Sequence, residues 1–206
     1  MQTVNNFDVL DPIVANKIQS ADDFLLVQLI ARRKDCKVDT IGKNHSLIDT
    51  FFVDSTHSLS SLREEIIAKC NQFQCRAYIR LNKRSYNDVA LTTIDFILKN
   101  IRSKQARAAY NAYLSACGKV HSDPDKTWVL DIDSKNEAVI ENITLDIIFR
   151  QRFAKREPMY IRIPTTNGIH LIVRPFDPRV YDASSQILSE YYSIHKDGPT
   201  LLYHSK

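Results

Sequence analysis

The order of the elements predicted for residues 127–204 constrains the fold of this chain more than any other feature. The spacing of apolar residues and turn residues predicts a strand, a helix, a β-hairpin, a second helix and a last strand region. These elements cover residues 127–133, 134–153, 159–164 with 169–176, 178–192 and 193–204. A β-α-β-β-α-β order is typical of the ferredoxin-like, or split βαβ, arrangement. Its helices cover one face of the sheet, so we expect the other face to meet the rest of the chain.

The residues before this region predict a smaller module of strands and helices. Alternating or continuous apolar runs indicate strands over 46–54 and 76–82. Helical spacing predicts helices over 20–33, 58–73, 85–101 and 106–118. In the helix over 85–101, the residues expected on the buried face are Val89, Ile94, Ile97 and Leu98.

The polar segment 119–126 marks the sharpest break in the pattern, so a module boundary is expected there. The fold class is therefore predicted to be α+β. An N-terminal α/β module, residues 1–118, would pack on a C-terminal RRM-like (ferredoxin-like) module, residues 119–206, and the two would form one compact core.

The composition is that of an ordinary globular protein of 206 residues, with 44% hydrophobic and 25% charged residues. The net charge of +4 is compatible with a polyanionic partner without requiring one. The four cysteines, Cys36, Cys70, Cys75 and Cys117, form no C-x-x-C pair, so we expect reduced thiols and no zinc site. No run of 18 apolar residues occurs, which predicts a cytoplasmic protein without a membrane partner.

Two carboxylates stand at the end of the strand over 127–133. Because side chains alternate along a strand, Asp131 and Asp133 point to the same face, with Cα atoms about 6.5 Å apart. At an effective dielectric constant near 20 their repulsion is roughly 2 to 3 kcal/mol, which a bound cation would reverse. Mg²⁺ is commonly held by one or two carboxylates together with waters and substrate phosphates. The alternative is that Asp133 caps the following helix and Asp131 is a solvated edge residue.

A third carboxylate, Asp197, belongs to the last strand region. If the start of that strand lies beside the end of the first, Asp197 approaches Asp131 and Asp133. Three clustered carboxylates are typical of two-metal phosphoryl transfer. The alternative is a plain Asp-Gly turn formed with Gly198.

The hairpin carries His170 two residues after Gly168, which allows close backbone approach. We expect His170 on a strand parallel to the first, nearer its opposite end, where a phosphate contact is more natural than metal ligation. Arg174 shares its face, and the turn residues Thr165, Thr166 and Asn167 offer hydrogen bonds. The alternative is a structural histidine.

Together these motifs resemble the archaeo-eukaryotic primase superfamily, the primase-polymerases. That family has a hydrophobic strand ending in D-x-D, then small-x-H, then an Asp in a hydrophobic setting. The matching residues are Leu130-Asp131-Ile132-Asp133, Gly168-Ile169-His170 and Asp197. The resemblance as a whole extends over roughly residues 46–203. Two departures are the polar flanks of Asp197, Lys196 and Gly198, and a glycine where the family often has serine.

The resemblance implies template-directed nucleotidyl transfer. Asp131 and Asp133 would bind two divalent ions, Mg²⁺ or Mn²⁺, Asp197 would complete the site, and His170 would hold the triphosphate. The other candidate substrate contacts are Gly168, Thr166, Asn167, Arg174 and Lys135. Single-stranded DNA template and nucleoside triphosphates would be the partners, and a separate helicase or other replication protein would supply the remaining activities.

Basic residues between the modules are candidate contacts to the nucleic-acid backbone, since such residues bind phosphate without reading sequence. They are Arg76, Arg80, Lys83 and Arg84, for which the alternative is a solvated strand face. Two other functions stay open: a non-catalytic RRM-like module that binds nucleic acid or nucleotide, and a metal-dependent nuclease. Simple RNA binding is disfavoured because carboxylates and a histidine occupy strand positions where RRM domains display aromatic residues.

Overall fold

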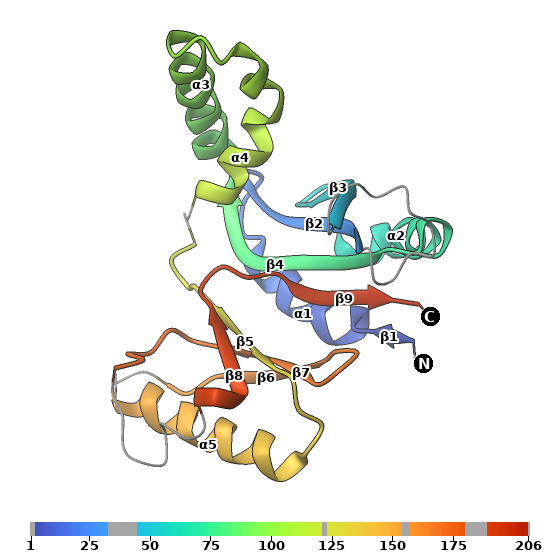
Figure 1. Ribbon diagram of the computed structural model, residues 1–206, viewed down its shortest axis with the longest axis vertical. Helices are drawn as coiled ribbons and strands as arrows, with labels where there is room; N and C mark the ends of the chain where they lie inside the picture. The colour runs from blue at the N-terminus through green and yellow to red at the C-terminus, as the bar shows by residue number, and fades with distance from the viewer. Residues whose placement is uncertain (1–2, 33–44, 121–122, 154–156, 180–188, 206) are drawn as a thin grey trace.

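The protein is an α+β molecule with two antiparallel sheets (Figure 1). The computed structural model describes residues 3–32, 45–120, 123–153, 157–179 and 189–205. Five α-helices lie within these ranges. The α+β fold class is therefore confirmed.

The first sheet has five strands in the order β1-β9-β4-β2-β3, and every neighbouring pair is antiparallel. Its strands are β1 (Val4–Asn5), β9 (Thr200–His204), β4 (Arg76–Ser85), β2 (Asp23–Arg32) and β3 (His45–Val53). Two helices, α1 (Phe7–Lys17) and α2 (Leu59–Phe73), contribute buried apolar residues to the same core as these strands. Ser58 caps α2, because its side chain accepts a hydrogen bond from the Ser61 N–H.

The second sheet has the order β6-β7-β5-β8, again with all neighbours antiparallel. Its strands are β6 (Tyr160–Pro164), β7 (Ile169–Val173), β5 (Trp128–Ile132) and β8 (Tyr192–His195). Leu130 and Ile132 pack against α5 (Glu137–Phe153) on one face. Val129 on the opposite face belongs to the core of the first sheet. The faces of β5 are thus as its alternation predicts.

A helical hairpin projects from the five-stranded sheet (Figure 1). It consists of α3 (Tyr86–Arg102), the 3-10 helix η1 (Ala106–Asn111) and α4 (Ala112–Lys119). A small core of Phe24, Leu26, Val89, Ala116 and Cys117 joins it to β2. Of the stripe expected on the buried face of α3, only Val89 is buried, whereas Ile94 and Leu98 are exposed.

Two predicted elements differ in the structure. The helix expected over 20–33 is the strand β2, whose apolar run is buried on both faces between β3 and β4. The last strand region divides into β8 of the second sheet and β9 of the first, so the end of the 119–206 segment joins the sheet of the 1–118 segment. The helix expected over 178–192 lies mostly outside the described residues. The described part of this range includes the 3-10 helix η2 (Ser189–Tyr191).

The thiols of Cys70, Cys75 and Cys117 are free and buried, as expected, and Cys36 lies outside the described residues. In the described part of the chain, every helix is too short or too polar to cross a membrane.

Candidate functional site

Asp131 and His170 lie directly opposite each other on the neighbouring strands β5 and β7. The imidazole Nε2 is 3.5 Å from the carboxylate Oδ1 of Asp131. The expectation of a parallel strand, with His170 toward its far end, is wrong because β5 and β7 run antiparallel in a register that pairs these two residues. The histidine therefore belongs to the carboxylate site itself.

The other side of the His170 ring is held by the first sheet. Nδ1 lies 2.9 Å from the hydroxyl oxygen of Thr200, which is the first residue of β9 and is fully buried. The His170 side chain is itself only 12% exposed, so the ring is fixed between Asp131 and Thr200. A residue of each sheet thus sets the orientation of the imidazole.

Asp131 stays ionised in this setting. The hydrogen bond with His170 lowers the pKa of the Asp131 carboxyl, against the effect of burial, and the charges of His170, His195 and Arg32 lower it further. Asp133 is exposed and lines the same cavity. Two carboxylates of the D-x-D motif therefore face one space, as their spacing predicts.

Gly168 explains why the hairpin turn needs a residue without a side chain. A Cβ added to Gly168 would lie 2.0 Å from the carbonyl oxygen of Ile132 and 2.8 Å from the backbone nitrogen of Ser134. No described glycine has a positive φ angle, so close contact rather than backbone conformation demands glycine here. The β6–β7 turn consequently rests on the backbone on both sides of Asp133.

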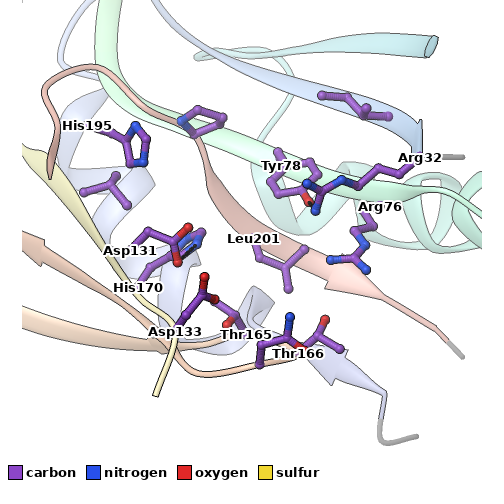
Figure 2. Close-up of a pocket in the computed structure, with 14 residues that line it drawn as sticks. Arg32, Arg76, Tyr78, Asp131, Asp133, Thr165, Thr166, His170, His195 and Leu201 are labelled. Atoms are coloured by element: carbon purple, nitrogen blue, oxygen red, sulfur yellow. Dashed lines mark hydrogen bonds and ion pairs between the residues drawn. The ribbon is translucent and has the colours of Figure 1, made fainter. Parts of the chain in front are cut away.

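The carboxylates and the imidazole line a cavity of about 480 Å³ between the two sheets (Figure 2). Arg32, Arg76 and Tyr78 from β2 and β4 form the facing wall. Arg76 is buried, and a guanidinium nitrogen of Arg32 lies 3.4 Å from the hydroxyl oxygen of Tyr78. The cavity therefore has anionic groups on one wall and cationic groups on the other. The remaining lining residues include Thr165, Thr166, Asn167, His195 and Leu201.

Asp197 does not approach the carboxylate pair. Because β8 ends at His195, which pairs with Val129, Asp197 lies beyond the start of β5 rather than beside its end. Its Oδ2 is 2.5 Å from Nη2 of the buried Arg84, and its Oδ1 accepts a hydrogen bond from Asn82 at 3.0 Å. Asp197 also lines a different cavity. The prediction that the three carboxylates form one cluster is therefore wrong.

The candidate nucleic-acid contacts on β4 are mostly engaged within the protein. Arg80 bonds to Asp197, as Arg84 does, and Lys83 forms an ion pair with Asp23 at 3.0 Å. Arg76 is the member of this set that lines the cavity.

Two candidate substrate contacts are also separated from the cavity. Arg174 donates to the carbonyl oxygen of Glu157, and Lys135 is exposed outside the cavity lining. The structure thus brings together Asp131, Asp133, His170, Thr166, Asn167 and Arg76, with Gly168 beside them.

Four residues of the site were missed by the sequence patterns. Tyr78 shares the alternating face of Arg76, and this signal was available in the strand over 76–82. Arg32 was hidden by the mistaken helix over 20–33. Thr200 and His195 gave no local signal, because their position depends on the division of the last strand region into β8 and β9.

Within the described ranges, no cluster of three or more His, Cys, Asp or Glu residues has the arrangement of a metal site formed by protein ligands alone. Comparisons of the chain with family models, with curated proteins and with solved structures gave no match. The function is therefore argued from the geometry of the cavity.

Proposed function

We propose that this protein is a metal-dependent nucleotidyltransferase of the primase-polymerase type, which extends a strand on a single-stranded DNA template with nucleoside triphosphates. The observation that supports this most is the meeting of the two motifs in one cavity: Asp131 and Asp133 beside His170, with Gly168 packed against the backbone that carries Asp133. These residues are 35 to 39 positions apart in the sequence, yet they form one wall.

The cavity suits a divalent cation that shares its ligands with a substrate. Asp131 and Asp133 would hold Mg²⁺ or Mn²⁺ through carboxylate oxygens, and waters and phosphate oxygens would fill the other positions. A divalent cation held there would supply charge stabilisation for the phosphate oxygens and activate the attacking hydroxyl. The low pKa of Asp131 keeps its carboxylate charged and ready to bind the cation.

The facing wall supplies the charge that a triphosphate requires. Arg32 and Arg76 line this wall, and guanidinium groups suit phosphate oxygens. Thr200 holds Nδ1 of His170, so Nε2, which lies 3.5 Å from Asp131, would turn from that carboxylate to donate to a bound phosphate. A volume of about 480 Å³ is in the range of small-molecule sites and fits a nucleotide.

The four-stranded sheet also agrees with an RRM-like catalytic module. Its order β6-β7-β5-β8 places the first strand between the third and the fourth, and α5 covers one face. The proposal includes a cytoplasmic location and a partner, such as a helicase, that opens duplex DNA. Arg32 and Arg76 replace Arg80, Lys83 and Arg84 in this proposal because they line the cavity.

The test compares the native protein with Asp131→Asn on a primed single-stranded template, with labelled nucleotides and Mg²⁺ or Mn²⁺. The control is Glu141→Gln, a similar change at an exposed position on α5. We expect product growth that Asp131→Asn lowers at least about a hundredfold and that Glu141→Gln preserves.

Three results would contradict this function. Shortening of the labelled strand that Asp131→Asn abolishes would indicate a nuclease. Nucleic-acid binding without turnover, insensitive to Asp131→Asn, would indicate a passive module. Synthesis equal in the native protein and Asp131→Asn would show that this cavity is not the active site.

A further inference from the structure

The outer face of α3 carries a row of large apolar side chains that solvent reaches. Leu91, Ile94, Leu98 and Ile101 are 65%, 54%, 46% and 55% exposed. Their spacing of three, four and three residues places them on one side of the helix, as positions a and d of a heptad do. Val89 and the half-buried Phe96 and Ile97 lie on other sides of α3.

We propose that this row, the α3 stripe, is the interface of a homodimer in which α3 pairs antiparallel with α3 of a second copy. The stripe is symmetric about its midpoint: Leu91 and Ile101 are equally far from residue 96, and so are Ile94 and Leu98. Antiparallel pairing therefore sets each leucine against an isoleucine of the other copy. A two-fold interface requires this self-complementarity.

Charges beside the stripe favour the antiparallel orientation. Asp88 and Asp95 lie along one flank in the N-terminal part of α3, and Lys99 and Arg102 lie along the same flank in the C-terminal part. Reversing one helix places Asp88 near Arg102 of the second copy, and the contact occurs twice by symmetry. In a parallel pair this flank would instead face the opposite flank of the second helix, where Ala90 and Ile97 stand and offer no opposite charge.

The position of α3 leaves the proposed active site accessible. The α3–α4 hairpin projects away from the space between the two sheets, which holds the cavity (Figure 1). The patch consists of four apolar side chains, whereas a standard interface has about 20 to 30 residues a side. Two such patches bury less than a standard interface of about 1,600 Å², so we expect a reversible, concentration-dependent dimer. This inference does not depend on the proposed function.

Sedimentation equilibrium of the full chain tests the proposal. Between about 1 μM and about 1 mM, the average mass is expected to rise from one toward two copies. Ile94→Glu should weaken association at least about tenfold, because it would bury a carboxylate in the stripe. Leu145→Glu, an equally exposed apolar position on α5, is the matched control and should leave association unchanged. Circular dichroism and the melting temperature check that both variants fold.

A charge exchange tests the orientation. Asp88→Lys and Arg102→Glu should each weaken the dimer, and the two changes together should restore it. A chain that stays monomeric at every concentration would overturn the proposal, and so would a chain that dimerises equally with Ile94→Glu. Either result would indicate that a different protein covers the stripe. A double variant that stays weak would overturn the antiparallel arrangement.

Discussion

The Cα of Gly168 lies so close to the backbone of Ile132 that a methyl group at this position would meet the Ile132 carbonyl oxygen at 2.0 Å. This contact joins the β6–β7 turn to the end of β5, between the two motifs that form the cavity wall. This contact and the β5–β7 register, which pairs Ile132 with Ile169, together set the separation of Asp133 from His170.

Gly168→Ala should shift the turn away from β5, since backbone atoms of Ile132 and Ser134 surround the new methyl group. We expect a loss of about 1–3 kcal/mol in the free energy of unfolding and a weaker affinity for Mn²⁺. Denaturant titration and Mn²⁺ binding measure the two effects. Gly118→Ala is the control, because nothing lies within 4 Å of its added Cβ and alanine favours the helix α4. Equal behaviour of the two variants would contradict the role of the contact.

Thr200→Val should disturb the proposed nucleotide site through His170. The valine keeps the shape of the side chain but removes the hydroxyl group 2.9 Å from Nδ1, which leaves a nearly buried ring nitrogen without this partner. We expect a loss of about 1–3 kcal/mol in stability and a rise in KM for the nucleotide, with recovery of KM in Thr200→Ser. Thr144→Val removes a buried hydroxyl group that bonds within α5, so it should affect stability alone. An unchanged KM in Thr200→Val would show that the hydroxyl group does not position the ring.

Asp197→Asn distinguishes a structural carboxylate from a metal ligand. Arg84 is fully buried, and the change would leave its charge without the carboxylate 2.5 Å away. Breaking a buried ion pair by removing one partner is expected to lower stability by about 3–5 kcal/mol. In the folded fraction, the affinity for Mn²⁺ should stay within about twofold of the native value. A selective loss of Mn²⁺ binding with unchanged stability would indicate that Asp197 is a metal ligand.

Acid should destabilise the protein partly through Asp54. Burial alone would raise the pKa of this carboxyl, but hydrogen bonds from Tyr86 and from the backbone N–H groups of His57 and Thr56 lower it below 3.8. The stabilisation is therefore present above pH 3.8 and is lost as the pH falls through the lower folded value.

Tyr86→Phe removes the hydroxyl group that lies 2.7 Å from Asp54. We expect a loss of about 2 kcal/mol in unfolding free energy at pH 7 and a smaller loss near pH 3. Urea titrations at the two pH values measure the difference. Tyr113→Phe, also in the α3–α4 hairpin and contacting Phe52, is the control. A loss independent of pH would contradict this linkage.

The strands and helices of residues 128–173 could be predicted because their apolar periods are clear. The shared face of Asp131 and Asp133 followed from alternation, whereas the pairing of His170 with Asp131 did not, because it depends on the antiparallel register of β5 and β7. The strand β2 could not be predicted from the sequence. Its residues Phe24, Leu25, Leu26 and Val27 are buried on both faces, and a continuous apolar run does not distinguish a central strand from a helix.

The position of Asp197 could not be predicted because it depends on a partner 113 residues away. The need of the buried Arg84 for a carboxylate appears only when the two sheets are assembled. The buried face expected for α3 was wrong at Ile94 and Leu98 for a related reason, since helical spacing identifies an apolar face but not what covers it. Register and burial at these places are set by tertiary contacts.

The location of β9 also bears on synthesis of the chain. Thr200 emerges from the ribosome 67 residues after Asp133, and β9 must then insert beside β4 before the imidazole gains its hydroxyl partner. A nascent chain consequently displays the acidic pair well before it can orient the histidine. The orientation of His170 is thus tied to the arrival of one late strand.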